Sequence, residues 1–271
     1  MKSGLAGVGV LITRPAGQSG PLAALIEAAG GEPILFPAIR IEPLPEADTA
    51  WALNGLQQFG LLIFVSPNAV RVAMPRILKR GGLPALAKVA AVGPGTTAEL
   101  KKSGARNIIS PQEGFDSEAL IRELSSLPLG GSRALVIRGQ GGRELLGEAL
   151  RSRGAEVEYL ECYRRVTPDR DMEELLPLWR SGALKACIAT SSTIVLNLHA
   201  MAGEAGRSWL LGTPFFVSHP RVAATAFSRG VQRVFVAGNG DEALVAGIKT
   251  WFARLRPLHA LHESVDFTQK I

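Results

Sequence analysis

The sequence is poor in cysteine and tyrosine and has neither a membrane-spanning run nor the pattern of a secretory signal. Among its 271 residues it contains two cysteines and two tyrosines, and no apolar run approaches the roughly 18 residues needed to cross a bilayer. The stretch from Met1 to Leu5 lacks the apolar core and cleavage site of a secretory signal, so we expect a cytoplasmic protein with no membrane partner. Cys162 and Cys187 lie in strand-like runs and are expected to be buried free thiols.

Motifs for nucleotides, metals and nucleophilic catalysis are also missing. The run 139–142, Gly-Gln-Gly-Gly, lacks the third glycine at dinucleotide-binding spacing, and no Gly-Lys-Ser or Gly-Lys-Thr occurs. The four histidines do not have the spacing of metal ligands, and no serine stands in a Gly-x-Ser-x-Gly elbow. The sequence therefore predicts no nucleotide-binding motif and no metal site. Of the four histidines, His219 is the one candidate for a position near a ligand, because it follows an expected strand.

The charge balance favours an anionic small molecule over a nucleic acid. The net charge is +6 and the pI about 9.7, but the basic residues are scattered and form no stripe interleaved with aromatics. Arginine supplies most of the excess, and its planar fork can bind two oxygens of a carboxylate or phosphate at once. A basic, solvated surface is the alternative for any single arginine.

The chain repeats itself at a nearly constant offset. Leu11 matches Leu135 and Ile63 matches Cys187, and both differences are 124. A repeat of this length is a whole domain and predicts two similar lobes, with a cleft between them that can close a ligand off from water. A duplication that only enlarged the protein is the alternative.

Short apolar runs alternate with amphipathic stretches of ten to fifteen residues, the pattern of an α/β fold with parallel sheets. The expected strands cover residues 8–13, 33–41, 60–65, 88–92, 106–110, 133–137, 156–165, 185–190, 214–218 and 232–236.

Two long extended segments, 33–45 and 156–168, occupy matching positions in the repeat and predict a two-stranded connector between the lobes. The ends of the chain would then share one lobe. Two consecutive lobes are the alternative. The expected boundaries are a first lobe of 1–38 with 168–255, a second lobe of 45–156, connector strands at 39–44 and 157–167, and a tail at 256–271.

Ligands of open parallel sheets bind beyond the carboxyl ends of the strands, and the loops there are rich in hydroxyls, glycine and arginine. Such groups at helix N-termini form anion sites, although serine and threonine also serve there as plain helix caps. The candidate ligand-binding residues are Arg14, Ser66, Asn68, Thr96, Arg138, Ser191, Ser192, Ser218 and Arg221. Tyr163 falls in the expected connector, where it either faces the cleft or packs against the connector.

Four motifs together resemble the uroporphyrinogen-III synthase family across residues 8–254. They are Ile-Thr-Arg-Pro at 12–15, Phe-Val-Ser-Pro-Asn-Ala-Val at 64–70, Ala-Val-Gly-Pro-Gly-Thr-Thr-Ala at 91–98 and Glu-Cys-Tyr-Arg-Arg at 161–165. The resemblance implies two flavodoxin-like α/β lobes joined by a two-stranded β-ladder, with the N-terminal segment completing the C-terminal lobe.

The resemblance also implies an activity: cyclisation of hydroxymethylbilane, a linear tetrapyrrole with several carboxylates, to uroporphyrinogen III without a cofactor and with inversion of the last ring. Tyr163 matches the family's tyrosine and is our candidate general acid, and Ser66, Asn68 and Thr96 match its first loops. The second lobe departs from the family, because Ser191 and Ser192 stand where many members have Ser-Pro. We expect a monomer. The rival functions are a non-catalytic two-lobe module that binds an anionic metabolite and a nucleotide-sugar transferase, which would need phosphate-binding motifs that the chain lacks.

Overall fold

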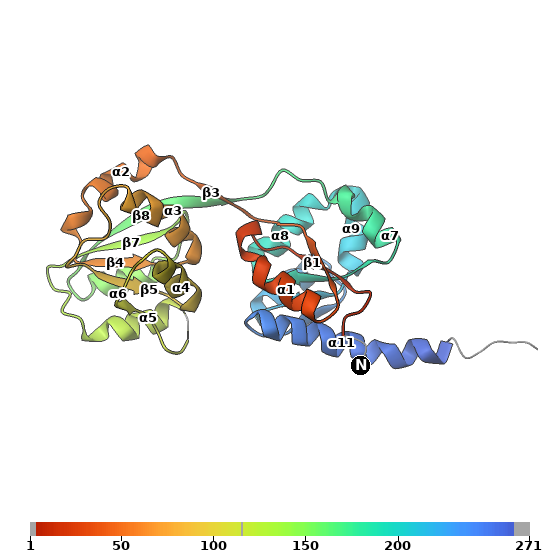
Figure 1. The fold of residues 1–271 in the computed structure, drawn as a ribbon. Coiled ribbons are helices and arrows are strands. Elements are labelled where there is room, and N and C mark those ends of the chain that lie inside the picture. The colour runs from red at the N-terminus through yellow and green to blue at the C-terminus, as the bar shows by residue number, and fades with distance from the viewer. Residues whose placement is uncertain (1–3, 115, 263–271) are drawn as a thin grey trace, which may run out of the picture. The chain divides into compact units, whose positions relative to one another are not determined.

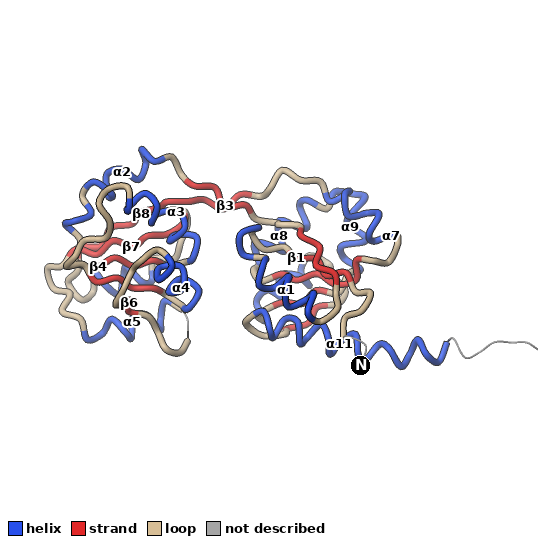
Figure 2. The backbone as a smooth tube through the Cα atoms, viewed as in Figure 1, coloured by secondary structure: helices blue, strands red, loops and turns tan. Residues whose placement is uncertain are grey.

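The computed structural model describes residues 4–114 and 116–262, and the chain divides into two compact units (Figure 1). Unit 1 consists of Met1–Arg40 with Thr167–Ile271, and unit 2 consists of Ile41–Val166. Each unit is an α/β structure with its own sheet, and in Figure 2 the strands of each unit lie among helices. The α/β class with parallel sheets is therefore confirmed.

Unit 1 contains a five-stranded sheet in which every pairing is parallel. Its strands are β1 (Gly9–Ile12), β2 (Glu32–Leu35), β9 (Leu184–Ala189), β10 (Phe215–Val217) and β11 (Val234–Val236). Its α-helices are α1 (Gly20–Ala28), α7 (Leu176–Arg180), α8 (Ser192–Met201), α9 (Gly203–Gly212), α10 (Pro220–Ser228) and α11 (Asp241–His262).

In unit 1, successive side chains of a strand point to opposite faces of the sheet and so pack against different helices. On β1, Val10 and Ile12 point to one face, where they pack with Ile26 of α1 and Ile248 of α11. Leu11 points to the other face and is equally buried. Both faces of a parallel sheet are covered, which is why β1 is a continuous apolar run and not an alternating one.

Unit 2 has a six-stranded sheet with the order β3-β8-β7-β4-β5-β6. Its strands are β3 (Arg40–Pro43), β4 (Leu61–Phe64), β5 (Lys88–Ala91), β6 (Ile108–Ile109), β7 (Arg133–Gly139) and β8 (Glu156–Val166). Its α-helices are α2 (Glu46–Asn54), α3 (Pro67–Leu78), α4 (Pro94–Lys102), α5 (Ser117–Glu123) and α6 (Leu145–Arg151). On β4, Phe64 packs against α3 through Met74, whereas Ile63 packs against α6 through Leu146.

The two sheets have the same strand order once the break in the chain is moved. Taken in chain order, the strands of unit 1 are arranged 2-1-3-4-5, the flavodoxin-like order. Unit 2 has that order too if β7 and β8 are counted first and β4, β5 and β6 follow, with β3 added at the edge. The repeat in the sequence pairs the same strands, since Leu11 lies in β1 and its match Leu135 lies in β7.

The segment 33–41, expected as one strand, is two. β2 ends at Leu35 and β3 begins at Arg40, and Pro37 lies in the gap without an N–H to continue a ladder. β3 then lies beside β8 in unit 2, where Leu44 N donates to Cys162 O at 3.0 Å and Arg164 pairs with Glu42 at 3.1 Å. Later residues of one segment meet earlier residues of the other, the pattern of antiparallel strands.

At its C-terminal end, the described part of the chain closes with α11. This helix continues through His262, so residues 256–262 of the expected tail are helical, and residues 263–271 lie outside the described residues. No described helix has the length and the apolar character that a membrane span requires.

Candidate active site

Tyr163 lies at the carboxyl end of the unit 2 sheet with its ring fully buried. It is on β8 opposite Gly139 of β7, and a Cβ atom at position 139 would lie 2.5 Å from Tyr163 Cζ. Glycine is therefore required at 139 by the close approach of the ring. The ring belongs to the core cluster that includes residues of α3 and β4.

The Tyr163 hydroxyl has two polar partners. Its oxygen lies 3.0 Å from Ser66 Oγ, and Arg165 Nη2 donates to it at 3.0 Å. Ser66 is the N-cap of α3 and accepts the Ala69 N–H at 3.1 Å. β4, which ends two residues before Ser66, and β8 thus bring a serine and a tyrosine that are 97 residues apart into hydrogen-bonding contact.

The loop after β5 lies against the loop after β4. A Cβ atom at Gly95 would lie 3.4 Å from Pro67 Cγ, so the start of α4 contacts the start of α3. Thr96 is buried in the first turn of α4, and Asn68 is half-buried in the first turn of α3. Three residues predicted from the sequence, Ser66, Asn68 and Thr96, therefore lie at the neighbouring starts of α3 and α4, and Ser66 contacts Tyr163.

Arg138 is buried and already paired. Its guanidinium contacts Glu144 at 2.9 Å and Glu161 at 3.2 Å, and it lies 3.9 Å from the centre of the Tyr159 ring. Only 8% of the residue is exposed, so a substrate carboxylate would have to displace one of these partners to reach it. Arg138, a ligand-binding candidate from the sequence, is thus held by two carboxylates in this structure.

Cys162 precedes Tyr163 on β8. Its thiol donates to the Arg138 carbonyl oxygen at 3.5 Å, and burial raises its pKa to about 12. Cys187 in β9 is also buried, and burial raises its pKa as well. Both are free thiols, as predicted, and neither has the character of a nucleophile.

The predicted residues of unit 1 lie at the carboxyl ends of its own strands. Ser191 is the N-cap of α8 and accepts the Ile194 N–H at 3.2 Å, while Ser192 Oγ lies 2.9 Å from Thr225 Oγ1. The remaining three residues of this set have different surroundings. Ser218 donates to the Thr190 carbonyl at 3.4 Å, Arg14 pairs with Asp241 at 2.5 Å, and the Arg221 side chain is exposed.

His219 caps a helix in this structure. Its Nδ1 accepts the Arg221 N–H at 3.1 Å at the start of α10, so the imidazole is engaged by the backbone. The expected position at a strand end is correct, and the imidazole serves there as the cap of α10.

Comparison with known proteins identifies the family. The family model described as uroporphyrinogen-III synthase HemD matches residues 20–246. The chain is 31% identical to a uroporphyrinogen-III synthase of Escherichia coli over 89% of this chain and 99% of that protein. It is 32% identical to that of Salmonella typhimurium over the same shares. The chain belongs to the uroporphyrinogen-III synthase family.

Solved structures agree with this family fold. A mutant uroporphyrinogen III synthase of Thermus thermophilus superposes with a TM-score of 0.56 at 22% identity, covering 91% of this chain and 99% of that one. The uroporphyrinogen-III synthetase of Helicobacter pylori superposes with the same TM-score at 14% identity, covering 91% of this chain and all of that one. At these identities the likeness establishes the fold.

Arg165 is a further residue of the site in this family member, beyond the candidates from the sequence. It is exposed, it contacts the Tyr163 hydroxyl and ring, and it has no ion pair among the described residues, whereas the neighbouring Arg164 pairs with Glu42. The signal was present in the sequence, because side chains two apart on a strand share a face.

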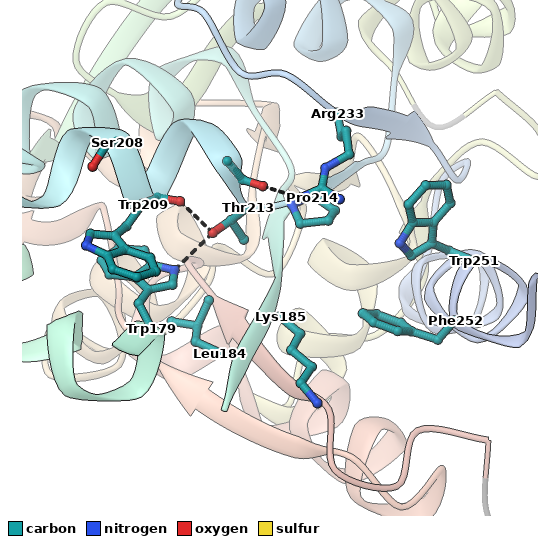
Figure 3. Close-up of a pocket in the computed structure, with 11 residues that line it drawn as sticks. Trp179, Leu184, Lys185, Ser208, Trp209, Thr213, Pro214, Arg233, Trp251 and Phe252 are labelled. Atoms are coloured by element: carbon teal, nitrogen blue, oxygen red, sulfur yellow. Dashed lines mark hydrogen bonds between the residues drawn. The ribbon is translucent and has the colours of Figure 1, made fainter. Parts of the chain in front are cut away.

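A pocket in unit 1 lies away from the predicted residues (Figure 3). It measures about 400 Å³ and includes Leu184 at the start of β9, Pro214 just before β10 and Arg233 just before β11. These are the amino ends of the strands, the opposite edge from Arg14 and Ser191. Trp179 and Trp209 form one side of it in Figure 3 and Trp251 another. In this family member this pocket is therefore separate from the candidate active site.

Proposed function

We propose that this chain is a uroporphyrinogen-III synthase, which converts hydroxymethylbilane to uroporphyrinogen III and one molecule of water without a cofactor. The observation that carries the proposal is the extent of the family match, with 31% identity over 99% of the Escherichia coli enzyme. The hydrogen-bonded hydroxyls of Ser66 and Tyr163 at a sheet edge support it. A non-catalytic binding module is not favoured, since the relatives are named as synthases.

The reaction begins with loss of the hydroxyl group at one end of the bilane. A proton donor assists as the C–O bond breaks, water leaves, and a cation conjugated with the pyrrole nitrogen remains. The substituted carbon of the far ring attacks this cation to form a spiro intermediate. Fragmentation and reclosure invert that ring, and loss of a proton restores the aromatic pyrrole. The Ser66–Tyr163 hydroxyl pair is the proposed source of the first proton.

The main task of the protein is geometric. Uncatalysed closure gives the isomer with the last ring not inverted, so the bilane has to be held with the less accessible carbon in reach of the cation. Loop amides and hydroxyls at the starts of α3, α4, α8 and α10 are suited to the substrate carboxylates, because helix N-termini present unpaired N–H groups. The proposed contacts include Ser66, Asn68, Thr96, Ser191, Ser192, Ser218 and Arg221, with Arg14 and Arg138 acting through exchange of their present carboxylate partners.

The oligomeric state, the cellular location and the lobe boundaries are also proposed. We propose a cytoplasmic monomer that does not bind nucleic acid, supported by two free thiols and by scattered basic residues. The proposed lobes are 1–38 with 168–255 and 45–156, connected by 39–44 and 157–167. The passage of the chain between units at 40–41 and at 166–167 supports these boundaries. Light scattering during gel filtration tests the monomer, which has a mass of 28.7 kDa.

A coupled assay tests the activity. Hydroxymethylbilane is generated in situ, the protein is added without metal or nucleotide, and the oxidised uroporphyrin isomers are separated by chromatography. We expect isomer III to predominate. Isomer I alone, at the rate seen without protein, would overturn the proposal, and calorimetric titration with a linear tetrapyrrole carboxylate would then test the binding module.

A further inference from the structure

The contact between Ser66 and Tyr163 admits one favourable arrangement of hydrogens, and that arrangement assigns different roles to the two residues. We infer that Ser66 gives its proton to the departing hydroxyl group of the substrate and receives the phenol proton of Tyr163 in its place, so that Tyr163 is a positioning residue that acts through Ser66. The proton released when the pyrrole regains its aromaticity restores the pair. The inference rests on the proposed function and replaces Tyr163 as the group in contact with substrate. It follows from three hydrogen bonds and the burial of one ring.

The phenol oxygen of Tyr163 accepts a hydrogen bond from a guanidinium. A guanidinium has no acceptor atom, so the 3.0 Å bond between Arg165 Nη2 and Tyr163 Oη uses a lone pair of the phenol. The phenol hydrogen must then find another acceptor. Among the described residues, the one remaining polar partner of Oη is Ser66 Oγ, at 3.0 Å.

Burial decides the direction of the bond between the two hydroxyls. If Ser66 donated to Tyr163, the phenol hydrogen would be left without an acceptor inside a core cluster, because Tyr163 is 0% exposed. A buried donor without a partner is costly and rare. Tyr163 therefore donates to Ser66.

Two hydrogen bonds to Ser66 Oγ determine where the serine hydrogen can point. Ser66 Oγ accepts from Tyr163 and also from the Ala69 N–H at 3.1 Å, so both lone pairs of the hydroxyl are used. The serine can then act toward a ligand only as a donor. Unlike Tyr163, Ser66 is half-buried at a strand end, where a ligand can meet it.

An internal comparison supports the assignment. Ser191 is the equivalent N-cap in unit 1, with φ −152° and ψ 156° against −159° and 158° at Ser66, and it accepts the Ile194 N–H at 3.2 Å. No phenol donates to Ser191 among the described contacts, so one of its lone pairs is not engaged in this way. The arrangement that makes serine an obligatory donor is thus a property of the unit 2 site.

Arg165 completes the arrangement. It supplies the bond that occupies a lone pair of Tyr163, and its charge is not neutralised by a carboxylate among the described residues. A carboxylate of the substrate can pair with it beside the departing hydroxyl, because a guanidinium fork binds two oxygens. Loss of Arg165 should therefore affect substrate affinity as well as turnover.

The test compares serine and tyrosine variants in the isomer III assay, with kcat and KM measured separately. We expect Ser66→Ala to lower kcat by roughly 100-fold or more, the usual contribution of a general acid. Tyr163→Phe should lower kcat less, by roughly 10-fold, since the serine hydrogen would remain but lose its direction. The double variant should be no slower than Ser66→Ala, because Tyr163 acts only through the serine. Ser66→Thr should recover most of kcat.

A solvent isotope comparison separates positioning from simple packing. The wild type should show a slower kcat in D2O, and this effect should disappear in Ser66→Ala and persist in Tyr163→Phe. If Tyr163→Phe abolishes kcat while Ser66→Ala keeps more than half of it, Tyr163 is the direct donor and the inference is overturned. If the losses multiply in the double variant, the two hydroxyls act independently, which also overturns it.

Controls separate proton donation from the helix cap. Ser66→Asn keeps a side-chain oxygen for the Ala69 N–H but has no hydroxyl, so its melting temperature should stay near that of the wild type while kcat falls as in Ser66→Ala. Asp116→Ala removes the cap of α5 in the same unit, where Asp116 accepts the Ala119 N–H at 2.8 Å, and should leave kcat unchanged. Wild-type protein that forms no isomer III refutes the proposed function, whereas wild-type activity with full kcat in Ser66→Ala refutes the inference alone.

Discussion

Arg14 Nη1 lies 2.5 Å from Asp241 Oδ1, so the guanidinium that follows β1 is neutralised by the first acid of α11. Both side chains are partly buried, with exposed fractions of 16% and 19%. An arginine held in this way binds a substrate carboxylate only by exchanging one partner for another. The same holds for Arg138, its counterpart in unit 2, which is held by Glu144 and Glu161.

Releasing Arg14 should strengthen substrate binding. In Asp241→Asn the guanidinium loses its internal carboxylate, and we expect KM for hydroxymethylbilane to fall about threefold to tenfold, which corresponds to roughly 1 kcal/mol. Glu242→Gln is the matched control, because Glu242 is the next acid on the same helix, is exposed and has no ion pair among the described residues. An unchanged KM in Asp241→Asn would assign Arg14 a purely structural role.

Removing Arg138 should destabilise unit 2. In Arg138→Ala, Glu161 loses its guanidinium partner, and the Tyr159 ring loses a packed cation, so we expect the free energy of unfolding to fall by roughly 2 kcal/mol. Arg143→Ala should change it by about 0.5 kcal/mol or less, since that arginine pairs with Glu118 in solvent. Urea unfolding measures both. An equal loss of unfolding free energy in the two variants would contradict the expectation that the buried ion pairs of Arg138 contribute more than the exposed pair of Arg143.

Gly139→Ala should damage the site through the Tyr163 ring. The new methyl group would lie 2.5 Å from Tyr163 Cζ, so the ring must move away and the bond to Ser66 must lengthen. We expect a loss of about 1–3 kcal/mol in stability together with lower kcat. Gly60→Ala introduces the same methyl group in open space and should do neither. Circular dichroism melting and the isomer III assay test the pair.

The two cysteines should be unreactive in the folded protein. Burial raises the pKa of Cys162 to about 12, so at pH 8 about one thiol in ten thousand is ionised, and Cys187 is buried as well. We expect Ellman's reagent to detect no thiol in the native protein at pH 8 and two after unfolding in guanidinium chloride. Rapid reaction of one native thiol would contradict this burial.

The same shift makes stability depend on alkaline pH. The pKa of each thiol is higher in the folded than in the unfolded state, so the folded protein binds more protons above the unfolded value of about 8.5. The associated stability is fully present below that pH and is lost as the pH rises toward 12. Cys162→Ala should reduce the loss of stability between pH 8.5 and 10 in urea unfolding.

The sequence was sufficient to predict the α/β class and the repeat, because both depend on local patterns of apolar residues. The prediction of a single strand at 33–41 was wrong, because Pro37 interrupts the hydrogen-bonded ladder. The composition of the segment is nevertheless typical of extended structure. The position of Tyr163 on a strand was predictable, but its burial was not. Burial depends on the approach of Gly139 across the sheet, which periodicity does not encode.

The pairing of charges was the least predictable part of the candidate site. Arg14 and Asp241 are far apart in the sequence, and nothing in the surroundings of either residue specifies the other. Arg165, in contrast, could have been found, because it lies two residues from Tyr163 on the same strand. Long-range ion pairs follow from tertiary packing, whereas neighbours on a strand follow from local geometry.

The interrupted unit 1 also has a consequence for synthesis on the ribosome. β1 is a central strand of its sheet, all four of its residues are buried, and one of its two partners is β9, which begins 172 residues after β1 ends. At about 5–20 residues per second, roughly 10 to 35 seconds pass before that partner emerges. Unit 2 is a continuous stretch and can fold during this interval. The nascent N-terminal segment meanwhile carries an apolar strand whose edge toward β9 is unpaired.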